Sequence, residues 1–206
     1  TLPLLMNVEA KPIYKNFAYT LPQGGTGSGG GCGCSHAPTY MIYRSSIPSM
    51  DEGWTRWVVE NYKVCCGNFK NITDKQIRAK EFGTPAIIFP DQTPNQILNG
   101  YAKGAMPDEY TGGIGKEGVD SLRKFVEDGG TLIFLNRASD FAIRQFNLPL
   151  KDVTDGLPNK DFYIPGSILR TQIDTNHPIA RTMPKESIAW FEDSPAFDVL
   201  DKTNVE

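Results

Sequence analysis

Short apolar runs alternate along this chain with segments in which apolar residues recur every three or four positions. The runs at 39–45, 85–90 and 131–136 are typical of buried strands. Weaker strand patterns lie at 67–71, 167–173 and 188–191, and helical spacing covers 49–62, 73–80, 116–130 and 139–146. Strands without polar alternation, separated by helices, indicate a parallel sheet covered on both faces. We therefore predict a three-layer, doubly wound α/β domain.

The helix after the first strand carries the clearest local signals. Ser49 and Glu52 have the spacing of a capping box, which places the helix start at Ser49. Four large residues then recur at helical spacing and predict one apolar face: Trp54, Trp57, Val58 and Tyr62.

The beginning of the chain differs in composition from the remainder. Seven of the 20 glycines fall between Gly24 and Gly33, and residues 24–38 read GGTGSGGGCGCSHAP. Gly/Ser-rich sequence buries too little apolar area to offset the entropy of ordering. We predict an extended N-terminal segment and Gly/Cys-rich linker over 1–38, followed by the α/β domain over 39–206.

Charge and hydropathy exclude two classes of partner. The net charge is −3, from 21 basic and 24 acidic side chains, whereas nucleic-acid binding needs a concentrated basic face. No apolar stretch approaches the roughly 20 residues that cross a bilayer. We expect neither nucleic-acid binding nor membrane insertion.

The four cysteines form two close pairs, Cys32 with Cys34 and Cys65 with Cys66. Their spacing differs from the C-x2-C pairs of structural zinc sites, so we predict no metal site and no cofactor. In an exported protein, disulfides between the two pairs would join the linker to the domain, and free thiols are the alternative.

Ligands of doubly wound folds bind beyond the carboxyl ends of the strands. Here these positions are 44–46, 91–92 with the long loop that follows, and 136–139. The loop 91–115 is long enough to carry a function. Our candidate cleft residues are Asp91, Gln92, Glu109, Tyr110, Asn136 and Arg137. Further carboxylates that we consider for the same cleft are Asp108, Glu192 and Asp193.

Most familiar catalytic motifs are absent. The histidines are His36 and His177, and neither belongs to an H-E-x-x-H or HxxE zinc motif. No G-x-S-x-G occurs, and the turn after the strand at 131–136 holds Asn136 and Arg137, neither of which is a nucleophile. We expect Ser139 to cap the following helix and His177 to shape a turn. TGGIG, at 111–115, precedes a helix and suits either an anion site or a tight turn.

Several longer motifs resemble a known family: DEGWTRW (51–57), IIFPDQ (87–92), LNG (98–100), PDEYTGGIGKEGVDSLRKFVEDGGTLIFL (107–135) and IAWFEDSPAF (188–197). As a set they resemble the C-terminal domain of bacterial secreted zinc carboxypeptidase-like proteins. That domain has the class I glutamine amidotransferase-like fold, which is a flavodoxin-like three-layer sandwich.

The resemblance implies an upstream metallopeptidase domain that holds zinc, and a secreted or periplasmic location. True amidotransferases carry a cysteine at the turn after the strand that matches TLIFL, and a later His-Pro-Glu. This sequence has Asn136-Arg137 and His177-Pro178-Ile179 instead, so both catalytic elements are missing.

Three hypotheses follow. The first is a non-catalytic accessory domain that binds a small polar ligand, or acts as a scaffold for the peptidase domain. The second is an enzyme that uses carboxylates and Arg137 on a small polar or sugar-like substrate. The third is an assembly module whose first 38 residues pack on a neighbouring subunit.

Overall fold

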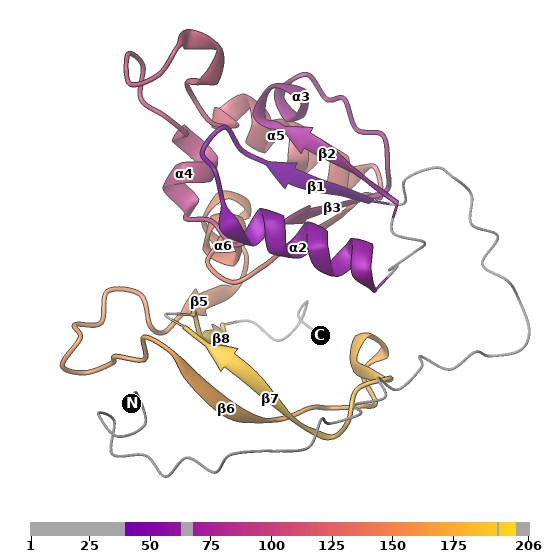
Figure 1. Cartoon of the computed structure of the whole chain (residues 1–206), viewed down its shortest axis with the longest axis vertical. Coiled ribbons are helices and arrows are strands. Elements are labelled where there is room, and N and C mark those ends of the chain that lie inside the picture. Colours follow the sequence, from indigo (N-terminus) through magenta and orange to yellow (C-terminus); the bar gives the residue numbers. More distant parts are fainter. Residues whose placement is uncertain (1–39, 63–67, 193, 201–206) are drawn as a thin grey trace, which may run out of the picture. The chain divides into compact units, whose positions relative to one another are not determined.

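The computed structural model describes residues 40–62, 68–192 and 194–200 (Figure 1). The predicted linker and all four cysteines lie outside these ranges. The strands are β1 (Tyr40–Arg44), β2 (Phe69–Thr73), β3 (Ala86–Phe89), β4 (Thr131–Phe134), β5 (Leu150–Asp152), β6 (Ser167–Gln172), β7 (Glu186–Phe191) and β8 (Phe197–Val199). The helices are α2 (Met50–Asn61), α3 (Asp74–Arg78), α4 (Pro94–Asn99), α5 (Gly115–Glu127) and α6 (Ala138–Phe146), with 3₁₀ turns η2 (Asp108–Tyr110) and η3 (Pro178–Ala180).

A parallel four-stranded sheet in the order β2-β1-β3-β4 forms the centre of the domain. Its register places Met41 of β1 opposite Ile87 of β3, and Ile87 opposite Leu132 of β4. The chain first moves outward from β1 to β2, then crosses back past β1 to β3 and on to β4. This is the doubly wound, flavodoxin-like topology that the apolar runs predict.

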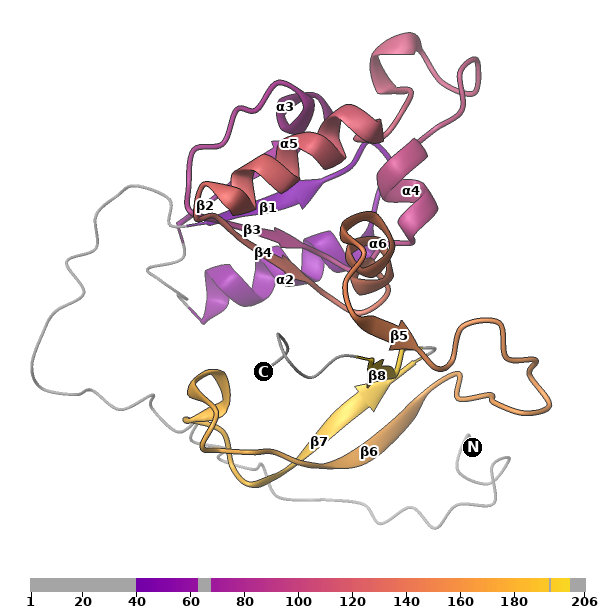
Figure 2. The same ribbon diagram turned by 180° about the vertical axis from the view of Figure 1, so that it is seen from behind.

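Helices cover the two faces of the sheet unequally. The larger core lies on the face toward α3, α4, α5 and α6, and includes Met41, Ile87, Leu122 and Phe141. On the other face lies α2 (Figures 1 and 2). Its Val59 packs in one cluster with Ile42 of β1. Right-handed crossovers in opposite directions place their helices on opposite faces, which gives the three layers.

The apolar face predicted for α2 is wrong in one respect. Trp54, Trp57, Val58 and Tyr62 share a helical spacing, but between 43% and 61% of each residue's surface is exposed. Val59 is the buried residue of this helix. The spacing shows which side chains share a face, but no element of the described residues covers that face.

The predicted helix starts are mostly confirmed. Ser49 caps α2 by accepting a hydrogen bond from the amide of Glu52 at 3.4 Å. The prediction that Ser139 caps α6 is wrong: the cap position is Arg137, and the Ser139 hydroxyl donates to the carbonyl of Phe134 at 3.3 Å. The tight turn after β4 starts α6 two residues earlier than the side-chain pattern indicates.

The predicted strands near 167–173 and 188–191 exist but do not extend the parallel sheet. They are β6 and β7, which form an antiparallel hairpin that pairs Ser167 with Phe191 and Gln172 with Glu186. A second antiparallel pair joins β5 to β8. The polar residues within β6 and β7 suit a two-stranded ribbon rather than a strand buried on both faces.

Candidate functional site

Two cavities lie at the carboxyl ends of the parallel strands, next to the beginning of α2. This is the position at which doubly wound sheets bind ligands, because the chain leaves neighbouring strands in opposite directions there. The first cavity lies beside β1 and the second lies between α2 and the ends of β3 and β4.

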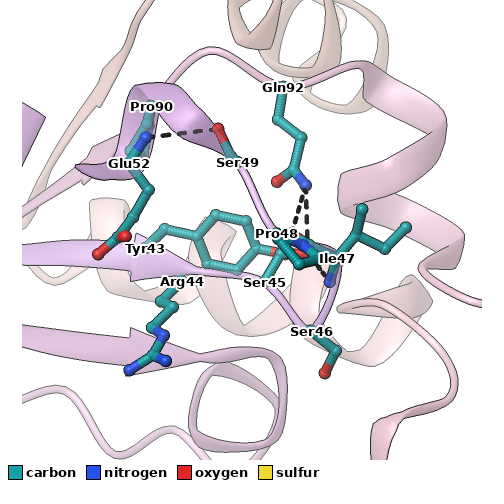
Figure 3. A pocket seen from close by; sticks show the side chains of 10 residues that line it. All are labelled: Tyr43, Arg44, Ser45, Ser46, Ile47, Pro48, Ser49, Glu52, Pro90 and Gln92. Atoms are coloured by element: carbon teal, nitrogen blue, oxygen red, sulfur yellow. Dashed lines mark hydrogen bonds between the residues drawn. The ribbon is translucent and has the colours of Figure 1, made fainter. Parts of the chain in front are cut away.

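The first cavity has a volume of about 190 Å³ and is shown in Figure 3. Gln92 is buried beside it, and its Nε2 donates at 3.2 Å to both Ser45 Oγ and the carbonyl of Ile47. The Ser49 hydroxyl donates to the carbonyl of Asp91 at 3.1 Å. These hydrogen bonds hold the loop after β1 in place. Because the bonded groups already satisfy one another, they leave few free hydrogen-bond partners for a ligand.

The buried carboxylate of Asp74 also holds this loop in place. Asp74 accepts hydrogen bonds from the Tyr43 hydroxyl at 2.5 Å and from the amide of Ser46 at 3.1 Å. Burial, followed by the neighbouring Asp74 charge, raises the pKa of Tyr43 well above its usual value. Tyr43 therefore stays protonated and acts as a hydrogen-bond donor.

The second cavity is larger, about 380 Å³, and combines apolar walls with polar groups. Its lining residues are Asp51, Trp54, Thr55, Val58 and Val59 from α2, Asp91 after β3, and Leu135 and Asn136 after β4. We call this cavity the α2 cleft. It brings together polar groups that three different elements contribute.

Asp91 is the most heavily bonded polar side chain of the α2 cleft. Its carboxylate accepts bonds from Asn136 Nδ2 at 2.9 Å, from the Arg137 amide at 3.2 Å, and from Arg137 Nε and Nη2 at 3.0 and 3.1 Å. The Asp91 side chain is 14% exposed and that of Arg137 is 46% exposed. This bidentate pair fixes the turn after β4 and leaves part of the guanidinium facing solvent.

The turn from β4 to α6 is a sharp strand-to-helix elbow. Asn136 occupies its apex with a φ of 51°, in the left-handed region that most residues avoid. Enzymes with an elbow of this kind place the nucleophile at the apex, where the side chain is exposed above the sheet. Here the apex side chain is an amide, and it is bonded to Asp91.

Asp51 faces the same cleft and has an altered acidity. Partial burial and the nearby charge of Asp91 raise its pKa above the usual value, while Arg137 opposes the shift. Glu192 adds a smaller effect that also raises it. The two carboxylates of the cleft therefore differ in their partners. Asp91 is bonded to the guanidinium of Arg137, whereas no cation is bonded to Asp51 among the described residues.

The predicted cleft residues divide into three groups. Asp91 and Asn136 line the α2 cleft, Arg137 is bonded to Asp91, and Gln92 lies in the neighbouring cavity. Glu109 and Tyr110 are exposed in η2 and line neither cavity. The same is true of Asp108. Asp193 and the four cysteines lie outside the described residues.

The residues predicted from the sequence do not include Leu135 or the α2 residues of the cleft, among them Asp51 and Trp54. The signal was available, because a capping box directly after the first strand places the first turn of that helix at the ligand-binding edge of the sheet. The helical spacing predicts an apolar face that contains Trp54, and the structure leaves 61% of the surface of this residue exposed.

The remaining motifs form turns. In TGGIG, the amide of Gly112 donates to the Tyr101 carbonyl at 2.9 Å and the amide of Ile114 donates to that of Ile97 at 3.0 Å. These two amides are committed to the fold, which favours the tight-turn interpretation. His177 accepts a bond from the amide of Ile179 at 3.3 Å, so its predicted role in a turn is confirmed.

Within the described ranges, no group of three or more His, Cys, Asp or Glu side chains is arranged to hold a metal ion. The same ranges contain no helix with the length and apolar character needed to cross a membrane.

Comparison with known proteins gives a likeness in fold. A ThuA-like protein from Bacteroides uniformis is 15% identical, with a TM-score of 0.45 over 79% of this chain and 61% of that chain. A GMP synthase subunit from Thermoplasma acidophilum is 12% identical, with a TM-score of 0.48 over 82% of this chain and 70% of that chain. No family model and no curated protein matches the chain.

Likenesses this distant concern the fold alone. The chain has a flavodoxin-like α/β fold, as its strand order and layers show. The comparisons give no support to a carboxypeptidase parent.

Proposed function

We propose that this domain is a non-catalytic binding module that holds a small polar ligand in the α2 cleft. The supporting observation is the occupied elbow: Asn136 stands where a nucleophile would stand, and its amide is bonded to Asp91 at 2.9 Å. Arg137 also engages Asp91, so the groups nearest the apex are locked in a structural network rather than poised to react.

The exposed groups of the cleft define what it would bind. Trp54 offers an aromatic surface and Asp51 a carboxylate without a bonded cation among the described residues. The half-exposed guanidinium of Arg137 is bonded to Asp91, a residue of the cleft wall. A small molecule with one apolar face and several hydrogen-bonding groups matches this set. The cleft volume of about 380 Å³ falls within the range of small-molecule sites.

Binding and turnover assays on the purified chain test the proposal together. A panel of free amino acids, dipeptides and disaccharides is titrated while the fluorescence of Trp54 is followed in a background of Trp57→Phe and Trp190→Phe. L-glutamine and a blocked dipeptide serve as substrates in parallel. We expect a fluorescence change with at least one class of compound and no product from either substrate.

Variants locate the signal. Arg137→Ala should weaken binding, and Arg170→Ala, an exposed arginine on β6, is the matched control that should not. Glutaminase or peptidase activity that persists through purification would sink the proposal, as would a binding signal that Arg137→Ala leaves unchanged.

One observation favours an enzyme as the second candidate. Asp51, which has a raised pKa, shares the cleft with a second carboxylate, Asp91, and paired carboxylates are a common arrangement for acid–base chemistry. This candidate predicts that Arg137→Ala abolishes turnover of a small polar or sugar-like substrate without unfolding the domain. Under the binding proposal the variant loses ligand retention and there is no turnover to lose.

We also propose that the domain belongs to an exported zinc carboxypeptidase-like protein. Three motifs support this proposal: DEGWTRW, EYTGGIG and WFEDSPAF. The upstream coding sequence tests it, since a peptidase domain would contain HxxE and a distant histidine, and their absence would count against the proposal.

Export would also permit disulfides between Cys32 or Cys34 and Cys65 or Cys66. Mass spectrometry before and after reduction tests the pairing, because two disulfides gain about four hydrogens on reduction. An unchanged mass would show free thiols.

A further inference from the structure

The parallel sheet ends at β4, and the outer edge of this strand is unpaired among the described residues. On the inner side, the amide of Thr131 donates to the Pro85 carbonyl at 2.8 Å and that of Leu135 donates to the Phe89 carbonyl at 3.0 Å. Because backbone groups of a strand alternate in direction, the amides of Leu132 and Phe134 point away from β3. Within the part of the chain that the structure describes, they form a row of open donors at the edge.

The side chains at this edge are apolar and uncovered. Ile133 is 41% exposed and Leu135 is 37% exposed, on the face where the cluster around Val59 of α2 includes residues of β1, β2 and β3 but none of β4. In the row Ile42–Ile88–Ile133, which the register aligns across the sheet, exposure increases from 0% at Ile42 to 41% at Ile133. Apolar side chains therefore continue to the outermost strand of the sheet, where they are exposed.

The opposite face of β4 has the same character. A hollow of about 540 Å³ runs beside the strand between α5 and α6. Val126 and Leu148 line it and are 46% and 39% exposed. Both sides of the strand thus present apolar surface, which monomeric proteins rarely leave contiguous.

The two edges of the sheet differ in a way that natural proteins use to control pairing. The other edge strand, β2, carries Lys70 and Asn71, polar residues that discourage association. β4 reads Thr-Leu-Ile-Phe and has no charge, proline or bulge. One edge is protected and the other is suited to accept a strand.

We propose that β4 pairs antiparallel with β4 of a second copy of this chain, which joins two four-stranded sheets into one. The strand is uncharged and apolar on both faces, so an identical strand is complementary to it, and a two-fold axis removes both open edges at once.

The directions of the backbone groups set the register. Leu132 and Phe134 carry the outward groups, so Leu132 pairs with the partner's Phe134 about a two-fold axis at Ile133. The Phe134 carbonyl already accepts a bond from the Ser139 hydroxyl at 3.3 Å and has a second lone pair for the partner. The row Ile42–Ile88–Ile133 then continues into the second sheet.

Molar mass measured over a wide concentration range tests the proposal. The wild-type chain should pass from monomer to dimer as concentration rises. Ile133→Lys places two ammonium groups opposite each other at the axis and should raise the dimer dissociation constant by at least about tenfold. The matched control is Ile188→Lys on the β6–β7 hairpin, where the isoleucine is 71% exposed, and it should leave the dimer intact.

Amide hydrogen exchange tests the register and needs no variant. At dimer concentrations the amides of Leu132 and Phe134 should gain protection, whereas those of Thr131 and Leu135 should be protected at every concentration. A monomer at all concentrations would overturn the proposal. So would a dimer insensitive to Ile133→Lys, or protection of Leu132 and Phe134 that does not depend on concentration, because that pattern means the edge is covered within one chain.

Discussion

The backbone conformation at Asn136 predicts which of two substitutions, to Ala or to Gly, gives the less stable protein. Replacing Asn136 by Ala or by Gly removes the same amide, and therefore the same 2.9 Å bond to Asp91. The two variants differ in how they tolerate the φ of 51°, and this difference must exceed the conformational freedom, about 0.5–1 kcal/mol, that Gly loses on folding relative to Ala. Glycine adopts this conformation freely, whereas for residues other than Gly, Asn and Asp it costs about 1–2 kcal/mol.

The magnitudes follow from these two contributions. A hydrogen bond to a charged group contributes about 1.5–3 kcal/mol, so both variants should lose stability from the missing amide. Gly regains about 1 kcal/mol from backbone relief, and Ala adds a further penalty. We therefore expect Asn136→Ala to be less stable than Asn136→Gly by about 1–2 kcal/mol.

Urea denaturation measures the difference, with unfolding free energies extrapolated to water. Asp120, an exposed residue in the middle of α5, supplies the matched control. In ordinary helical backbone Ala is more stable than Gly by about 1 kcal/mol, so the order there should be reversed. An Ala variant at position 136 as stable as the Gly variant would refute the elbow geometry.

Three further predictions concern the cleft and the core. Asp51 has a raised pKa in the folded chain, so its own contribution to stability should be lost as pH rises from 3.8 through that pKa; over this range the wild type should lose stability relative to Asp51→Asn in pH-dependent urea titrations, and parallel profiles would exclude the shift. Phe141 is fully buried, and Phe141→Ala should cost about 3–5 kcal/mol in the same assay, so a cost no larger than that of typical surface changes would contradict the core assignment. At Gly113 an added Cβ would overlap the carbonyl of Ile97, so Gly113→Ala should lower the melting temperature, and an unaltered melt would show that this turn has room.

Much of the sheet could be predicted from the sequence because its strands are apolar on both faces. The runs around Ile87 and Leu132 have this character, and the structure places both in the parallel sheet. The helix that contains Val119 and Leu122 follows from their spacing, and both side chains are buried. In these cases the local pattern and the tertiary environment agree.

The exposed aromatic residues of α2 could not be predicted in the same way. Periodicity reports which side chains share a face, but burial depends on whether a distant element covers that face. Trp54 and Trp57 therefore satisfied the pattern for a core helix, yet 61% and 48% of their surfaces are exposed. The same limit applies to β6 and β7, because the local sequence of a strand does not show which other strand it pairs with.

The candidate site was partly predictable. Strand ends identify Asp91 and Asn136, because every parallel strand ends at the ligand-binding edge. Glu109 and Tyr110 belong to the same loop as Asp91 but line neither cavity, and sequence gives no distance across a loop. Asp51 could have been found from the capping box of Ser49 and Glu52, because it lies within this first turn of α2.

The most direct test of the central claim is a ligand titration followed by NMR, with the compound recovered and analysed afterward. Amino acids, dipeptides and disaccharides are the probes, and the reporters are the Trp54 indole and the amides of Asn136 and Arg137. A non-catalytic binding module predicts that one class of compound shifts these signals together and is recovered unchanged. Conversion of the bound compound to product, or shifts confined to residues outside the α2 cleft, would contradict the account.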